Sequence, residues 1–130
     1  MTTTERVMPA PGSNIEIQPF WDGAAAGRLM LKFCKACGKY HYYPRALCPH
    51  CLSDQTEWRP ASGKGTVYSY SVMRRVPQPY ALAYIALEEG VTMMSNVVEA
   101  DLDALRIGMP VKAAFRKTDG DIVAPVFVPA

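Results

Sequence analysis

The second half of the chain alternates between short apolar runs and groups of turn-forming residues. In the run TVYSYSVMRR, residues 66–75, alternate residues share a face of an extended strand. This period predicts one face with Val67, Ser69, Ser71 and Met73 and an opposite face with Tyr68, Tyr70 and Val72. Four further runs have the apolar content of strands: residues 80–90, 91–100, 109–117 and 122–128.

Turn signals separate these runs and indicate their order. Glu89-Gly90 predicts a hairpin between the second and third runs, and TDGD at residues 118–121 predicts a turn between the last two. The segment DLDALRIG, residues 101–108, predicts a short helical turn that Asp101 caps. Five strands with a short helix between the third and the fourth are the element order of a five-stranded Greek-key barrel, the OB-fold.

The first half of the chain has a different pattern of apolar and turn-forming residues. Residues 1–14 contain Thr, Pro, Gly, Ser and Asn without periodicity, which predicts a disordered tail. Residues 15–27 predict a short helix with Pro19 in its first turn and Gly27 at its end. RLMLKF, residues 28–33, predicts a strand.

The helix carries two large apolar side chains, Phe20 and Trp21. Two interpretations stay open for them. They pack against the rest of the domain, or they dock into a groove on a partner protein, because aromatic residues are over-represented at binding hot spots.

All four cysteines lie within CKACGKYHYYPRALCPHC, residues 34–51, as two C-x-x-C pairs separated by ten residues. Two such turns brought together supply four thiolates in a tetrahedron, the geometry of structural zinc. The predicted metal ligands are therefore Cys34, Cys37, Cys48 and Cys51. Four thiolates leave no open position for water, so one structural Zn²⁺ ion is expected, and it would stabilise a unit with little core of its own.

The residues around the cysteines agree with a metal site. Gly38 follows the second cysteine, where a tight turn favours positive φ, and Pro49 stiffens the second pair. Tetrahedral sulfur sites also hold iron, and this pattern is similar to rubredoxin, although the spacer is shorter. With four cysteines present, we expect neither His41 nor His50 to be a ligand.

We therefore expect three parts: a disordered tail at 1–14, a helix with a zinc ribbon at 15–60, and an OB-fold domain at 61–130. Residues 53–65, rich in turn formers, are the expected connector. The predicted fold class is mainly β, of the α+β type.

Charge and composition limit the classes of function that fit the chain. The chain of 130 residues carries a formal charge of only +2, which is less basic than most dedicated nucleic-acid binders. No apolar run reaches the length of a membrane helix and the first residues lack the apolar core of a signal peptide. These features predict a cytoplasmic protein, in which the cysteines stay reduced.

Together these motifs resemble the family called "domain of unknown function 35", over roughly residues 18–128. The resemblance rests on the order of helix, ribbon and barrel and on the residues Phe20, Trp21, Gly23, Gly27, Leu29, Cys34, Cys37, Gly38, Cys48, Pro49, Cys51, Gly63, Gly65, Asn96, Gly108 and Val111. It implies a small non-catalytic subunit that acts with a thiolase-fold protein on acyl-CoA thioesters, in thiolysis, acyl transfer or retro-aldol cleavage. Such a subunit supports assembly and covers the CoA or acyl site.

CoA carries phosphate groups, which bind cations. The candidate CoA-binding residues are Lys64, Arg74, Arg75, Lys112 and Arg116, with ordinary solvated surface charges as the alternative interpretation. Two other functions stay open. A zinc ribbon with an OB-fold also suits a nucleic-acid-binding module, and an iron-loaded ribbon suits a rubredoxin-like electron carrier.

Overall fold

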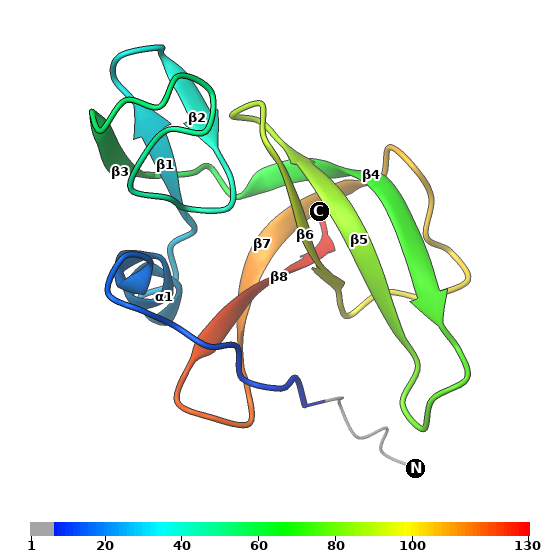
Figure 1. The fold of residues 1–130 in the computed structure, drawn as a ribbon. Coiled ribbons are helices and arrows are strands. Elements are labelled where there is room, and N and C mark those ends of the chain that lie inside the picture. Colours follow the sequence, from blue (N-terminus) through cyan, green and yellow to red (C-terminus); the bar gives the residue numbers. More distant parts are fainter. Residues whose placement is uncertain (1–6) are drawn as a thin grey trace.

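The computed structural model describes residues 7–130 and contains a small ribbon, one helix and a barrel (Figure 1). The elements in chain order are α1 (Gln18–Ala25), β1 (Met30–Cys34), β2 (Lys39–His41), β3 (Thr56–Pro60), β4 (Lys64–Met73), β5 (Tyr80–Leu87), β6 (Thr92–Val97), β7 (Pro110–Lys117) and β8 (Val123–Pro129). The mainly β fold with one short helix is therefore confirmed.

Strands β4 to β8 form a closed barrel in the order β4-β5-β6-β8-β7. All neighbours are antiparallel except β6 and β8, which meet in parallel where Val97 pairs with Phe127. This is the predicted five-stranded OB-type barrel. The turn at Glu89-Gly90 is also as predicted: Gly90 has φ 92°, and its N–H donates to Leu87 O at 3.0 Å.

The short helix predicted between the third and fourth barrel strands does not form, but the turn that Asp101 was predicted to cap is present. Residues 98–109 form turns, and Asp101 closes one of them by accepting the Ala104 N–H at its backbone oxygen (3.0 Å) and the Asp103 N–H at its side chain (2.9 Å). Leu105 follows this turn and packs in the hydrophobic core, where it is 6% exposed.

A β-bulge interrupts the alternation of β4. Val67 pairs with Ile85, but the next pair is Ser69 with Tyr84, so Tyr68 is an extra residue on β4. The two faces of the strand therefore exchange at this point, and the predicted grouping of Val67 with the serines is wrong. An unbroken period of two cannot reveal such a bulge, because one additional residue changes the face of every position after it.

The ribbon is a three-stranded antiparallel sheet in the order β2-β1-β3. Strand β3 lies in the segment 53–65, which was predicted as a connector, so this prediction is wrong. Thr56 to Pro60 are extended because they pair residue by residue with Cys34 to Met30. Pairing with β1, rather than the local sequence, decides that β3 is a strand.

Helix α1 is shorter than the predicted 15–27. Pro19 lies in its first turn, as predicted, and Gly27 follows its end with φ 78°. The Gly27 N–H donates to Ala24 O at 3.0 Å and the Arg28 N–H donates to Gly23 O at 2.8 Å, which is a Schellman motif. This motif reverses the chain and directs it into β1.

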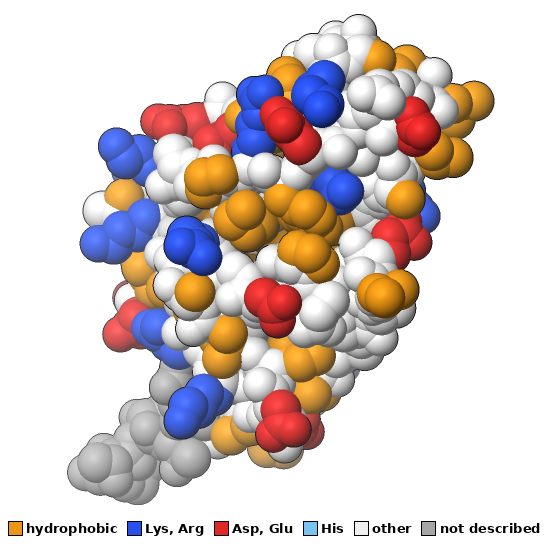
Figure 2. Space-filling model, turned by 90° about the vertical axis from the view of Figure 1, so that its left-hand side faces the viewer, with side chains coloured by type: hydrophobic (Ala, Val, Ile, Leu, Met, Phe, Trp, Pro, Cys, Tyr) orange, Lys and Arg blue, Asp and Glu red, His pale blue; other side chains and the backbone are white. Residues whose placement is uncertain are grey.

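One continuous hydrophobic core joins all three parts. It contains Phe20 and Trp21 from α1, Leu31 from β1, and barrel residues such as Ile85 and Phe127. On the side of the molecule that carries α1, hydrophobic side chains gather in the middle of the face and Lys, Arg, Asp and Glu side chains surround them (Figure 2). Packing in this shared core, in addition to the covalent connection, therefore holds the ribbon against the barrel.

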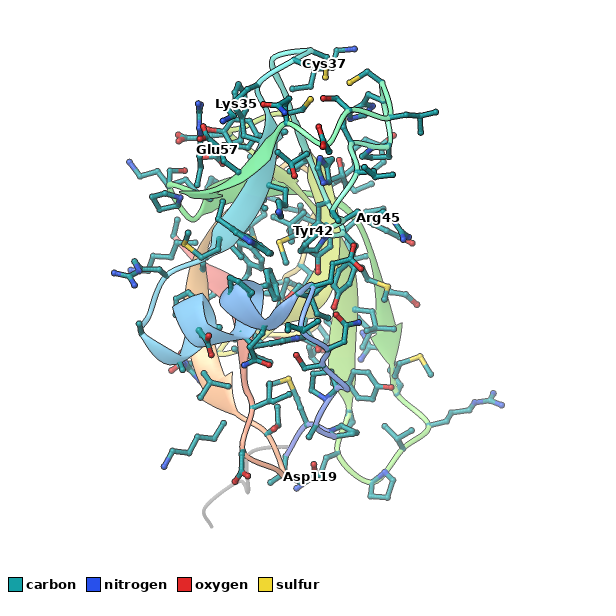
Figure 3. The ribbon with its side chains drawn as sticks, turned by 60° about the vertical axis from the view of Figure 1, so that its left-hand side comes forward. Lys35, Cys37, Tyr42, Arg45, Glu57 and Asp119 are labelled. Atoms are coloured by element: carbon teal, nitrogen blue, oxygen red, sulfur yellow. The ribbon has the colours of Figure 1, made fainter. Side chains whose placement is uncertain are left out.

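The segment before α1 runs beside the turn between β7 and β8, where Figure 3 labels Asp119. Met8 bridges Thr118, the Asp119 N–H donates to Met8 O at 2.9 Å, and the Asp119 carboxylate accepts the Ala10 N–H at 2.7 Å. Residues 1–6 of the predicted disordered tail lie outside the described residues. Between residues 7 and 130, no helix is both long and apolar enough to cross a membrane.

We predict that Gly65→Ala destabilises the barrel by about 1–3 kcal/mol, the usual cost of overpacking. A Cβ at Gly65 would lie 2.7 Å from the backbone oxygen of Ala86 and 2.9 Å from Cγ2 of Ile85, so the paired strands must move apart. Urea denaturation measures the change. Gly12→Ala is the control, because nothing lies within 4 Å of its Cβ position; equal stabilities of the two variants would contradict the prediction.

Candidate metal centre

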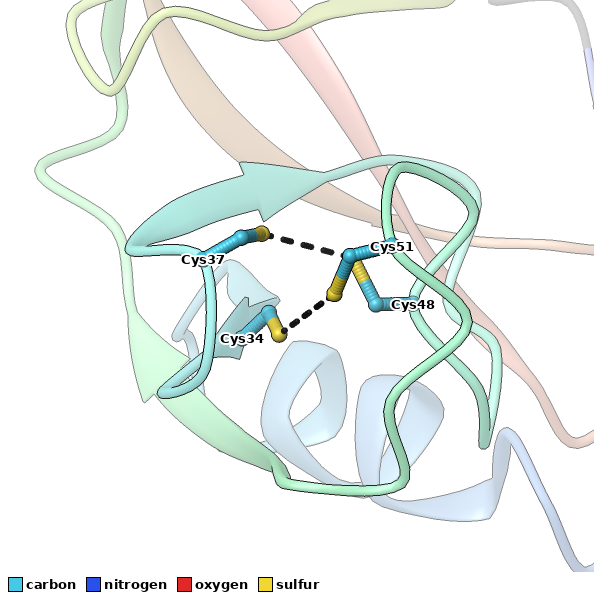
Figure 4. Close-up of side chains that lie close together, drawn as sticks. All are labelled: Cys34, Cys37, Cys48 and Cys51. Carbon is cyan, nitrogen blue, oxygen red and sulfur yellow. Dashed lines mark hydrogen bonds between the residues drawn. The ribbon is translucent and has the colours of Figure 1, made fainter.

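The four cysteines converge at one point of the ribbon (Figure 4). Their Sγ atoms all lie within 4.8 Å of one another, with Cys34 and Cys51 at 3.6 Å and Cys37 and Cys48 at 3.7 Å. A metal with sulfur ligands at about 2.3 Å in a tetrahedron separates the sulfurs by about 3.8 Å. The donor set and its spacing therefore fit a tetrahedral metal ion.

Two similar loops aim the sulfurs. In the first, the Gly38 N–H donates to Cys34 O at 2.8 Å; in the second, the Leu52 N–H donates to Cys48 O at the same distance. Both closing residues have positive φ, 73° for Gly38 and 64° for Leu52. Gly38 is as predicted. Leu52 was missed, because leucine rarely adopts this conformation and gives no sequence signal for it.

Hydrogen bonding lowers the pKa of one thiol in the cluster, whereas burial raises the pKa of another. A hydrogen bond from the backbone N–H of Cys37 lowers the pKa of the Cys34 thiol to about 7. Burial raises the pKa of the Cys37 thiol to about 12. Metal binding has to displace the remaining thiol protons, so the affinity for metal rises with pH.

Cations cover the aromatic rings of the ribbon sheet. The Arg59 guanidinium lies 3.6 Å from the centre of the Phe33 ring and is paired with Glu57 at 2.6 Å. The Lys32 ammonium lies 4.8 Å from the centre of the Trp58 ring, and burial lowers its pKa. These contacts stabilise β1 against β3 where the sheet is too small to have a core of its own.

Neither histidine belongs to the cysteine cluster. His41 lies on β2 and is 2% exposed, and burial lowers its pKa, which favours the neutral ring. His50 lies between the second pair of cysteines, and its Nε2 is 3.4 Å from the backbone oxygen of Tyr40. Both histidines line a cleft of about 550 Å³ between the ribbon and the β5–β6 turn, where Glu89 forms part of the opposite wall.

The predicted docking residues lie inside the protein. Phe20 is 1% exposed and Trp21 is 8% exposed, and their rings meet edge to face with centres 4.8 Å apart. The Tyr42 ring lies between the ribbon and α1, with its centre 6.0 Å from the centre of the Phe20 ring (Figure 3). The structure thus supports the packing interpretation and corrects the docking one, because the rings already fill the junction of helix, ribbon and barrel.

The five candidate CoA-binding residues do not form one site. Lys64 and Lys112 are opposite each other on β4 and β7, so the structure brings these two together. Arg74 and Arg75 follow the far end of β4, roughly 30 Å away along an extended strand. Arg74 pairs with Asp103 at 2.7 Å, and Arg116 pairs with Glu99, so both already have carboxylate partners.

Two family models match the chain, one for each part. The model described as "ChsH2, rubredoxin-like zinc ribbon domain" matches residues 21–57, and "ChsH2, C-terminal OB-fold domain" matches residues 58–116. A solved structure described as "Ltp2-ChsH2(DUF35) aldolase" superposes with a TM-score of 0.82 and 34% identity, over 92% of this chain and 98% of that chain.

Three curated relatives each align with more than half of this chain. The "Probable enoyl-CoA hydratase alpha subunit" of Thermomonospora curvata is 35% identical over 94% of this chain, which spans only 40% of that relative. A "DUF35 domain-containing scaffold protein" of Methanocaldococcus jannaschii is 41% identical over 68% of this chain and 69% of the relative. The "Benzoylsuccinyl-CoA thiolase subunit BbsA" of Geobacter metallireducens is 31% identical over 56% of this chain and 51% of the relative.

We predict that Cys34→Ser loses most of its bound metal and that the ribbon unfolds. The ion supplies on the order of 10 kcal/mol of folding free energy to a site of this kind, and one missing thiolate breaks the tetrahedron. Elemental analysis of the purified protein measures the metal, and hydrogen exchange compares the amides of β1–β3 with those of the barrel. Lys35→Ser, an exposed neighbour, is the control. A Cys34→Ser protein with wild-type metal content would refute the site.

Proposed function

The chain belongs to the DUF35 family of zinc-ribbon and OB-fold proteins, and on that premise we propose that it is a non-catalytic accessory subunit of a thiolase-fold enzyme. The enzyme acts on acyl-CoA thioesters, by thiolysis, acyl transfer or retro-aldol cleavage of a carbon–carbon bond. The accessory subunit supports the assembly of the complex and covers the CoA or acyl site.

One observation carries this proposal. The chain superposes on a chain of the solved structure described as "Ltp2-ChsH2(DUF35) aldolase" with a TM-score of 0.82, over 98% of that chain and 92% of this one. Relatives described as an enoyl-CoA hydratase subunit and a thiolase subunit support CoA thioesters as the substrate class, and a relative described as a scaffold supports a role in assembly.

The chemistry of the described residues agrees with a supporting role. All four thiols face one another in the metal centre, so none of them is available to attack a thioester. His41 is buried, and within the described part of the chain neither of its ring nitrogens is hydrogen-bonded to a side chain that could act as a nucleophile. The nucleophile and the base then belong to the partner enzyme.

Zinc is the metal we assign to the four cysteines. A closed set of four thiolates suits structural zinc, which stabilises the ribbon and takes no part in the reaction. Iron prefers the same tetrahedral sulfur geometry. Elemental analysis of the wild-type protein separates the two ions, because an iron-loaded site also colours the protein and would indicate an electron carrier.

The contact with CoA is assigned to Lys64 and Lys112. They are the only two of the five candidates that the structure places opposite each other, and two ammonium groups on adjacent strands suit a phosphate. Arg74 and Arg116 are worse placed, since they already form ion pairs with Asp103 and Glu99.

We predict that the tagged protein co-purifies with a thiolase-fold subunit in a fixed ratio, and that nuclease treatment does not release it. Mass spectrometry of the captured material identifies the subunit, and size-exclusion chromatography gives the ratio. A contact between two proteins buries neutral surface and does not require nucleic acid. The affinity of a nucleic-acid binder, in contrast, depends strongly on the salt concentration. Capture of nucleic acid, or loss of all partners with nuclease, would refute the proposal.

We also predict that the double variant Lys64→Ala/Lys112→Ala weakens acyl-CoA binding by the assembled complex about 10-fold, because charge-assisted bonds to phosphate contribute about 1.5 kcal/mol or more. Isothermal titration calorimetry measures the dissociation constant. Lys117→Ala, also exposed on β7 but at the opposite end of the strand, is the control. An unchanged dissociation constant in the double variant would place the phosphates on the partner subunit alone.

A further inference from the structure

The outward surface of the barrel strands β4, β5 and β6 has an unusual composition. The strand register assigns the outward positions, because Ala81, Ala83 and Ile85 are buried and their neighbours on β5 point the other way. The outward residues of β5 and β6 are Leu82, Tyr84, Ala86, Thr92, Met94 and Asn96. Opposite them, β4 contributes only Ser, Thr and Tyr side chains between Thr66 and Ser71. We call this surface the outer face.

None of these outer-face residues carries a charge. This differs from the side of the molecule that carries α1, where Lys, Arg, Asp and Glu side chains surround the hydrophobic ones (Figure 2). Soluble monomers normally place charged residues on the solvent side of a sheet, and depletion of charge with enrichment of Tyr and Met is the composition of an interface centre.

Three large side chains form a row across the middle of the outer face. Tyr84 and Met94 are direct cross-strand partners and are 50% and 56% exposed. The bulge adds Tyr68 beside them, 66% exposed, because Tyr68 and Ser69 together are opposite Tyr84. Ile107, 71% exposed, borders the row from the loop before β7, where the Gly108 N–H donates to Val67 O at 2.7 Å.

The lack of charge decides which class of partner fits. A nucleic acid on the outer face would need cations along its backbone, in addition to the stacking tyrosines. A neutral surface of Tyr and Met side chains instead matches another neutral protein surface, where such residues act as hot spots.

The size of the patch argues against a second copy of this chain. At these exposures, three side chains of about 200 Å² each offer on the order of 300 Å², whereas a standard interface buries about 800 Å² on each partner. In two copies face to face, both outer faces would belong to closed barrels and would curve away from each other, so contact would be limited to the row. A larger partner that curves around the barrel can bury the row together with its neighbours.

We propose that the outer face, centred on Tyr68, Tyr84 and Met94, is the surface on which the thiolase-fold subunit docks through a neutral, apolar patch of its own. This inference rests on the proposed function and adds the place of contact. The β-bulge has a direct role in it, because it turns a third large side chain toward the partner.

The test uses Tyr84→Lys and Met94→Lys in the full chain, against the purified thiolase-fold subunit that the pull-down identifies. Both side chains point into solvent, so the lysines are hydrated in the free protein, and circular dichroism with metal analysis checks the fold. Ile15→Lys is the matched control, because it adds the same charge at an apolar residue that is 96% exposed and lies before α1.

We expect each of the two variants to raise the dissociation constant at least about 30-fold, the effect of losing a hot spot, while Ile15→Lys changes it less than about 2-fold. Unchanged binding in both variants, or equal loss in all three, would overturn the assignment. A wild-type dimer that Met94→Lys dissociates, seen by light scattering, would assign the outer face to a second copy instead. If the wild-type chain binds no thiolase-fold protein, the proposed function itself is refuted, and this assignment with it.

Discussion

The convergence of four sulfur atoms is the constraint on which the arrangement of the N-terminal half depends. Strands of five, three and five residues cannot bury enough surface to be stable alone. The two loops that carry the cysteines place Gly38 and Leu52 in the left-handed region, which glycine adopts readily but which costs free energy at Leu52. Binding of a metal by the four thiolates would offset this cost, in addition to the packing of the ribbon against the helix and the barrel.

Once the ribbon is closed, its position on the barrel follows from packing. Phe20 lies where helix, ribbon and barrel meet, and Leu31 of β1 is fully buried in the same core. The Schellman motif at Gly27 aims the chain from α1 into β1, so the helix and the first cysteine are coupled by a few residues. A rigid junction of this kind suits a subunit whose function is to hold a partner in shape, since a flexible one would transmit little constraint.

The distribution of charged and neutral residues on the protein surface also suits the role of an accessory subunit. Cations and carboxylates concentrate on the ribbon and at the strand ends, where Arg59 pairs with Glu57 and Arg74 with Asp103. The outer face of the barrel is neutral and displays Tyr84 and Met94 to solvent. Charge at the margin with neutral surface in the middle is the usual composition of a protein interface.

The sequence alone determined the features that depend on local spacing. Two C-x-x-C pairs predicted the metal site, Gly27, Gly38 and Gly90 predicted turns, and alternating runs predicted the strands of the barrel, because each of these signals lies within a few residues. Tertiary structure decided what depends on distant partners. Strand β3 forms because it pairs with β1. The bulge at Tyr68 exchanges the two faces of β4, and Phe20 and Trp21 are buried in the core. The fold likewise paired Arg116 with Glu99 and Arg74 with Asp103. A local sequence pattern cannot predict these features, because each depends on interactions between residues that only the folded chain brings together.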